Sequence, residues 1–147
     1  MLEDLGDPRP RRRNGRSSVA PRVTVVNDNP EFLELVRDIL ADERIPTTLI
    51  DGDKPDALER IRESRPEVLM IDLRMGSDEL HGWDIAQEVR RDAELAEIPI
   101  LVCSADVVSL ATIQKQLDDT RRVDTLTKPF SIDRLSEAID RLYQPAR

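Results

Sequence analysis

The chain contains few of the residues on which several functional classes depend. Of its 147 residues, one is cysteine, one is histidine and 3% are aromatic. Cys103 alone can form neither an internal disulfide nor a cysteine-built metal cluster, and its apolar neighbours predict a small buried hydrophobe. With so few aromatic side chains, the core must be built from Val, Ile, Leu and Ala. That composition favours a helix-covered sheet over an aromatic-rich sandwich.

Long hydrophobic runs are also missing. No apolar stretch is long enough to span a bilayer, and the first residues include no secretory core segment. We therefore expect a cytoplasmic protein with no membrane partner. A chain of this length with 39% hydrophobic residues can bury one core. It is expected to form one domain, with no room for a separate output domain.

The net charge of -8 is unevenly distributed, because residues 1–22 contain six Arg and three acids. Prolines, a glycine and like charges predict that residues 1–21 form a disordered basic arm. The acidic remainder argues against a nucleic-acid-binding domain. Two interpretations of the arm stay open: an electrostatic contact with nucleic acid or an acidic partner, or a solvated extension. The second is favoured, since a short Arg run is a weak signal.

From residue 22 onward, two apolar patterns alternate. Short β-branched or continuous apolar runs predict strands at residues 23–26, 46–50, 66–72, 98–104 and 123–127. Helical spacing predicts helices at 30–42, 56–64, 83–92 and 107–117, with a last helix that Ser131 caps. Strict alternation of this kind predicts an α/β domain over residues 22–145. Its core would be a doubly wound five-stranded parallel sheet flanked by five helices.

Polar residues stand where the predicted strands end. Asn27 and Asp28 follow the first strand, Asp72 ends the third, Ser104 ends the fourth and Lys128 follows the fifth. Because the carboxyl ends of parallel strands share one edge, we expect these side chains to meet. Two nearby carboxylates repel each other unless a cation lies between them, and oxygen ligands select a hard ion such as Mg²⁺. An aspartate there could attack a phosphodonor, and a lysine and a hydroxyl could hold the phosphate.

Four pieces of sequence carry a family resemblance. They are Asn27-Asp28, Asp72-Leu73-Arg74-Met75, Ser104-Ala105 and Thr127-Lys128-Pro129-Phe130. Together they resemble the receiver domain of two-component response regulators, which has a flavodoxin-like fold. The resemblance covers about residues 22–145. It implies that Asp72 accepts a phosphoryl group from a partner histidine kinase or histidine phosphotransfer protein.

The resemblance also implies a role for each matching residue. Asp28, Asp72 and the backbone carbonyl of Arg74 would bind Mg²⁺, while Ser104 would bind the phosphate and relay the switch. Lys128 would pair with the phosphate, and the bond between Lys128 and the following proline is usually cis in this family. The family's usual dimer or partner face lies around the fourth and fifth strands. A homodimer and an unidentified downstream protein target are therefore implied.

The chain departs from the family pattern at three places. Asn27 stands where a second acid is usual, which predicts weaker Mg²⁺ binding, with Asn27 reaching the metal only through a bound water. Thr125 replaces the aromatic switch residue, so output coupling would use other groups. The loop at 76–82 is about two residues longer than usual and lacks the proline that commonly follows the methionine.

These features lead to one main hypothesis and two others. The main hypothesis is a stand-alone receiver that acts by reversible phosphorylation and loses its own phosphate slowly, without being an enzyme in the usual sense. The alternative is a phosphorylation-independent binding module, motivated by Asn27 and Thr125. A phosphatase-like enzyme ranks lower, because Arg74 stands where that class carries a second acid.

Two conspicuous residues receive ordinary interpretations. His81 has no helical context and no companion histidine, so we expect it on a surface loop. Trp83 begins the third predicted helix and is expected to pack against the core rather than to serve as a binding platform.

Overall fold

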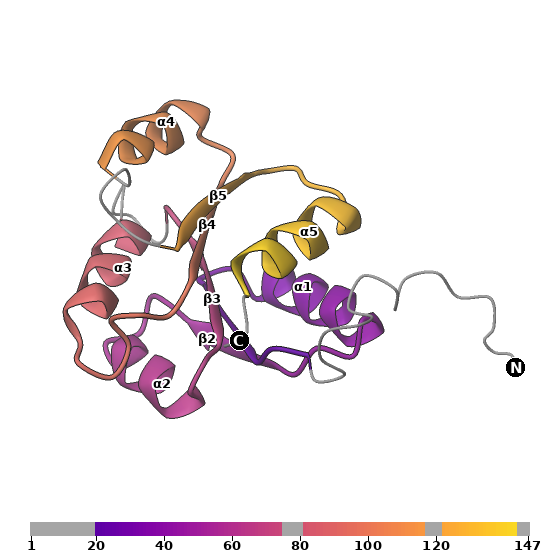
Figure 1. The fold of residues 1–147 in the computed structure, drawn as a ribbon, viewed down its shortest axis with the longest axis horizontal. Helices are drawn as coiled ribbons and strands as arrows, with labels where there is room; N and C mark the ends of the chain where they lie inside the picture. Colours follow the sequence, from indigo (N-terminus) through magenta and orange to yellow (C-terminus); the bar gives the residue numbers. More distant parts are fainter. Residues whose placement is uncertain (1–19, 75–80, 117–121, 144–147) are drawn as a thin grey trace, which may run out of the picture.

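The computed structural model describes residues 20–74, 81–116 and 122–143, in which five strands alternate with five helices (Figure 1). The strands are β1 Val23–Asn27, β2 Thr47–Asp51, β3 Val68–Asp72, β4 Ile100–Ser104 and β5 Val123–Thr127. The helices are α1 Pro30–Asp42, α2 Ala57–Ser64, α3 His81–Arg91, α4 Val107–Gln116 and α5 Ile132–Leu142. The basic arm predicted at 1–21 and the long loop after Met75 lie almost entirely outside the described residues.

The strands form one parallel sheet in the order β2-β1-β3-β4-β5. In the two outer strand pairs the last residues lie opposite each other: Asn27 of β1 lies opposite Asp51 of β2, and Ser104 of β4 lies opposite Thr127 of β5. Asp72, the last residue of β3, stands opposite Cys103. The predicted doubly wound parallel sheet is confirmed, and its strands end together at one edge.

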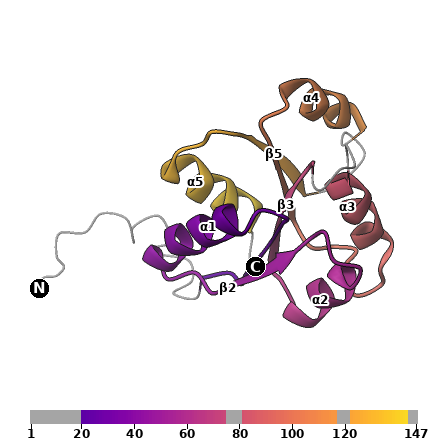
Figure 2. The same cartoon turned by 180° about the vertical axis from the view of Figure 1, so that it is seen from behind.

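The helices cover both faces of this sheet. Figures 1 and 2 show α1 and α5 on one face and α2, α3 and α4 on the other. Alternate residues of β3 enter the two resulting core clusters: Leu69 and Ile71 pack on the α2, α3 and α4 side, Val68 and Met70 on the α1 and α5 side. The third strand is therefore buried on both faces, as its continuous apolar run predicts.

The predicted Ser131 cap of the last helix is confirmed, and Asn29 caps the first helix. The Asn29 side chain accepts hydrogen bonds from the backbone N–H groups of Glu31 and Phe32, and Pro30 occupies the first turn of α1. Ser131 accepts from the N–H of Arg134 at 3.1 Å. These caps fix where α1 begins after β1 and where α5 begins after β5. Both helices thereby start beside the carboxyl edge of the sheet.

Several predicted boundaries were wrong by one to two residues at strand starts. Strand β2 begins at Thr47, after Pro46, and β4 begins after Pro99, because a proline has no N–H to donate to the sheet. Strand β3 begins at Val68 rather than Pro66, and Glu67 and Val68 both donate to the carbonyl of Arg22.

The prediction for His81 was wrong. His81 is the first residue of α3 and is half-buried, and its Nε2 lies 3.0 Å from the carbonyl oxygen of Gly52. Its ring links the start of α3 to the loop after β2. Cys103, by contrast, is buried in the core as predicted, and burial raises the pKa of its thiol. Within the described ranges, no helix has the length and apolar character to cross a membrane.

Candidate phosphoacceptor site

The residues predicted to converge do so at the carboxyl edge of the sheet. Asp72 ends β3, and Lys128 follows β5. The Lys128 Nζ lies 3.0 Å from Asp72 Oδ1, with the two side chains 25% and 11% exposed. Because β4 lies between β3 and β5, the lysine side chain reaches over the end of β4 to the aspartate. This places a cation directly on the candidate nucleophile.

The environment of Asp72 disfavours its charged form. Burial raises the pKa of this carboxyl, and the negative charge of Asp28 raises it further. The Lys128 ammonium acts in the opposite direction by hydrogen bonding and by its charge. The carboxylates of Asp28 and Asp72 therefore repel each other, and a cation bound between them would relieve this repulsion.

Asn27 is buried at the base of this edge. Its Oδ1 accepts a hydrogen bond from the N–H of Asn29 at 2.8 Å, and the residue is 2% exposed. The amide thus shapes the loop that carries Asp28, without adding a charge. Across the part of the chain that the structure describes, no group of three or more His, Cys, Asp or Glu side chains is placed to hold a metal. Asp28 and Asp72 carry the anionic charge of the site.

These donors fit a magnesium ion. Mg²⁺ is usually held by one or two carboxylates together with substrate phosphates and waters, rather than by a cage of protein ligands. Asp28 and Asp72 supply two carboxylates whose repulsion already raises the pKa of Asp72. The backbone carbonyl of Arg74, two residues beyond Asp72, is a further oxygen donor. That Asn27 would reach such an ion through a bound water stays a prediction.

Ser104 ends β4 beneath the lysine. Its backbone carbonyl accepts the N–H of Lys128 at 2.9 Å, and its hydroxyl accepts the N–H of Asp106 at 3.0 Å. The preceding carbonyl, that of Cys103, accepts the N–H of Leu73 at 2.8 Å. The last two carbonyls of β4 therefore hydrogen-bond both Leu73, which follows β3, and Lys128, which follows β5.

Sequence reasoning assigned Arg74 only a backbone role, and the structure gives its side chain one as well. Arg74 Nη1 lies 3.0 Å from Asp106 Oδ2, to which Ser109 Oγ also donates at 2.7 Å. The N–H of Ser109 donates to Asp106 Oδ1, so Asp106 caps α4. Hydrogen bonds from Ser109, aided by the charge of Arg74, lower the pKa of Asp106. An aspartate directly before a predicted helix was the available signal for this cap.

Gly82 is a second residue that sequence reasoning missed. It is the second residue of α3, and its N–H donates to the carbonyl of Leu73 at 3.0 Å. A Cβ at this position would overlap the carbonyl oxygen of Asp72. The helix can therefore approach the backbone of Asp72 only because residue 82 has no side chain. The sequence pattern offered no signal for this contact, because Gly82 falls in the loop predicted before the helix at 83–92.

Thr125 lies in the middle of β5, opposite Val102 and half-buried. It stands two residues before Thr127, the residue of the same strand that pairs with Ser104. The suggestion that output coupling bypasses Thr125 stays a prediction.

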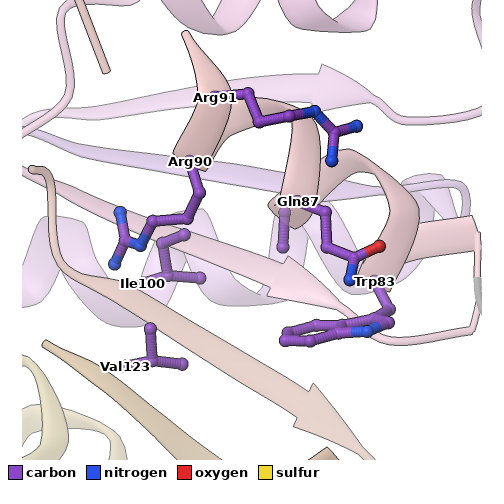
Figure 3. A pocket seen from close by; sticks show the side chains of 7 residues that line it. Trp83, Gln87, Arg90, Arg91, Ile100 and Val123 are labelled. Carbon is purple, nitrogen blue, oxygen red and sulfur yellow. The ribbon is translucent and has the colours of Figure 1, made fainter. Parts of the chain in front are cut away.

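A cavity of about 220 Å³ lies away from this edge (Figure 3). Trp83 and Gln87 of α3 line it together with Ile100 and Val123. Ile100 and Val123 begin β4 and β5, whereas Trp83 lies in the first turn of α3, so the cavity runs along the sheet beneath that helix. Trp83 also packs against the core, as predicted. The cavity is separate from the cluster around Asp72.

Comparison with known proteins gives a consistent result. The family model of the response regulator receiver domain matches residues 23–140. The sensor histidine kinase TmoS of Ectopseudomonas mendocina is 33% identical over 122 residues, which cover 83% of this chain and 12% of that protein. The first curated relatives matched also include DNA-binding response regulators. The chain spans between 12% and 54% of the length of these relatives.

Solved structures match the fold over most of the chain. The chemotaxis response regulator CheY4 of Vibrio cholerae superimposes with a TM-score of 0.68 at 23% identity, covering 85% of this chain and 99% of that one. The receiver domain of a sensor histidine kinase from Pseudomonas aeruginosa PAO1 also has a TM-score of 0.68, at 21% identity, covering 85% and 98%. That structure is described with a magnesium ion coordinated in the active site cleft.

Proposed function

Because the chain belongs to the response regulator receiver family, we propose that Asp72 is its phosphoacceptor and that the phosphorylated domain signals through protein contacts. One observation carries this assignment: Lys128 Nζ lies 3.0 Å from Asp72 Oδ1 at the carboxyl edge of the sheet. A half-buried carboxylate paired with a lysine, at the place where open α/β sheets bind ligands, is suited to hold a transferred phosphoryl group.

The transfer uses the groups already described. A carboxylate oxygen of Asp72 attacks the phosphorus of a phosphohistidine, a new P–O bond forms, and the P–N bond breaks to release the imidazole. The Lys128 ammonium then pairs with a phosphate oxygen instead of with the free carboxylate. The Ser104 hydroxyl can donate its O–H to another phosphate oxygen while its oxygen still accepts the N–H of Asp106.

Asp28, Asp72 and the Arg74 carbonyl are the residues that would hold Mg²⁺. When bound, the ion neutralises the charge that gathers between two carboxylates and the incoming phosphoryl oxygens. The rise in the pKa of Asp72 caused partly by Asp28 supports this donor set. Asn27 contributes no charge, so we expect weaker binding than with an aspartate at that position.

The domain over residues 22–145 would act in the cytoplasm, with a histidine kinase or histidine phosphotransfer protein as its phosphodonor. We do not expect an enzyme in the usual sense, since its one covalent substrate is its own side chain. A homodimer or a downstream protein would receive the signal. The alternative of a phosphorylation-independent binding module is not favoured by the family match.

Intact mass spectrometry after incubation with Mg²⁺ and acetyl phosphate tests the assignment. We expect one added phosphate on the wild-type chain and none on Asp72→Asn. Asp51→Asn is the matched control, because Asp51 ends the edge strand β2 at the same side of the sheet. It should still take up phosphate. Unchanged labelling of Asp72→Asn would refute the assignment of the nucleophile.

A further inference from the structure

The Lys128 ammonium has a second contact besides Asp72. Its Nζ lies 4.2 Å from the centroid of the Phe32 ring. The same nitrogen is 3.0 Å from Asp72 Oδ1. The cation is therefore held between a carboxylate and the face of an aromatic ring, within the distance at which the ring quadrupole attracts a positive charge.

The start of α1 fixes the position of this ring. Asn29 caps the helix and accepts the N–H of Phe32 at 3.3 Å, so Phe32 stands in the first turn, close to the strand end that carries Asp28. The Phe130 ring packs against Phe32 nearly at a right angle, with centroids 6.3 Å apart and planes at 82°. Edge-to-face packing of this kind holds an aromatic ring in one orientation.

These two rings are the only phenylalanines of the chain. Both are partly buried against the core cluster on the α1 and α5 face. Phe32 lies four residues after Asp28, and Phe130 lies two residues after Lys128. The fold thus brings an aromatic pair from two distant segments of the sequence to the Lys128 ammonium.

We propose that Phe32 is a positioning residue for phosphoryl transfer: its ring face holds the Lys128 ammonium at the carboxyl edge. This inference rests on the proposed function. A lysine side chain is long and flexible, and an ordered ammonium costs rotamer entropy that a fixed ring face offsets. Sequence reasoning did not predict this contact, because helical spacing marks Phe32 only as an inward-facing residue.

An aromatic ring suits this role better than a hydrogen-bond acceptor. The ammonium must exchange the carboxylate for phosphate oxygens once Asp72 is phosphorylated. A ring attracts the cation without occupying one of its N–H donors, so all three donors stay available to oxygen. A carboxylate or carbonyl in the place of Phe32 would compete with the phosphate for those donors.

Phosphorylation rates provide the first test. With acetyl phosphate and saturating Mg²⁺, Phe32→Leu should slow labelling of Asp72 roughly fivefold, because leucine keeps the apolar contact and removes the ring quadrupole. Phe32→Tyr should stay within about twofold of wild type, since tyrosine retains the ring face. Val36→Ala is the packing control, because Val36 is buried in the same helix and core cluster and should lose stability in urea without a matching loss of labelling rate. Phe130→Leu removes the ring that orients Phe32 and should slow labelling less than Phe32→Leu.

A double-variant cycle separates positioning from packing. In a Lys128→Met background, Phe32→Leu should cause no further loss of rate, since the cation that the ring holds is absent. A general packing defect would instead reduce the rate by the same factor in both backgrounds. That result would overturn the inference.

A spectroscopic readout does not depend on phosphorylation. The ε-methylene protons of Lys128 should show an upfield ring-current shift in NMR spectra of the wild-type chain, lost in Phe32→Leu and retained in Phe32→Tyr. Absence of the shift overturns the inference. If wild type is phosphorylated and Phe32→Leu reacts equally fast, the inference fails and the proposed function stands. If wild type takes up no phosphate, the proposed function fails and the positioning role fails with it.

Discussion

Replacing Gly82 by alanine sets two effects of opposite sign against each other. Alanine is the better helix former, and in an unobstructed helix the change stabilises a protein by about 0.4–1 kcal/mol. At this position, however, the new Cβ would overlap the carbonyl oxygen of Asp72 and lie 2.9 Å from that of Leu73. Both obstacles are backbone atoms of the phosphoacceptor segment, which cannot rotate aside as a side chain would.

Relief of the overlap requires α3 to move away from β3. That movement loosens the packing of Ile85, Ala86 and Val89 and lengthens the hydrogen bond from Gly82 to the carbonyl of Leu73. Overpacking costs about 1–3 kcal/mol, and the weakened hydrogen bond adds up to about 1 kcal/mol. The steric cost exceeds the gain in helix propensity. We expect Gly82→Ala to lower the free energy of unfolding by about 1–3 kcal/mol.

Urea denaturation followed by far-UV circular dichroism measures this change. Gln87→Ala, on an exposed part of the same helix, is the matched control and should change the free energy of unfolding by no more than about 0.5 kcal/mol. A Gly82→Ala variant more stable than wild type would refute the close approach of α3 to Asp72. Phosphorylation of Asp72 in the variant should also slow, since relief of the overlap displaces its backbone.

Three further predictions concern stability and metal binding. The Ser136 hydroxyl is fully buried and has no hydrogen-bond partner within the described part of the chain, so Ser136→Ala should raise the free energy of unfolding by about 1 kcal/mol in urea denaturation; a loss would contradict it. A hydrogen bond from Arg62 lowers the pKa of Asp92 in the folded chain. The ionised carboxylate therefore stabilises the fold at pH values above its unfolded pKa of about 3.9. This contribution is lost as the pH falls through the lower pKa of the folded state. Urea midpoints of Asp92→Asn should lie below those of wild type at pH 7 and converge with them towards pH 3; a constant gap would refute this. Asn27→Asp should tighten Mg²⁺ binding roughly tenfold in a Trp83 fluorescence titration, because it adds a negative charge beside Asp28. Equal Mg²⁺ affinities of the variant and wild type would refute this prediction.

The sequence was sufficient to predict the sheet and the convergence on Asp72, because both follow from local patterns. Strand ends that carry Asp28, Asp72, Ser104 and Lys128 must meet once the strands are parallel. The predicted cis peptide between Lys128 and Pro129, which came from the family resemblance, is also present in the structure.

The residues that were missed depend on distances between elements. Gly82 matters because α3 approaches the backbone of β3. Phe32 matters because its ring lies under the ammonium of Lys128, a residue far from it in the sequence. Neither distance leaves a periodic signal in the sequence. His81 was placed wrongly because its helix begins two residues before the first apolar position that marks the helical pattern.

The pairing of Lys128 with Asp72 also has a consequence for biosynthesis. Asp28 and Asp72 leave the ribosome well before β5, and the lysine reaches Asp72 only after β5 has paired with β4. Parallel pairings of this kind join distant segments and form late. A nascent or truncated chain that lacks β5 therefore carries the Asp28 and Asp72 carboxylates without the ammonium that pairs with Asp72. The negative charge at this edge of the sheet is partly neutralised only when the last strand has joined the sheet.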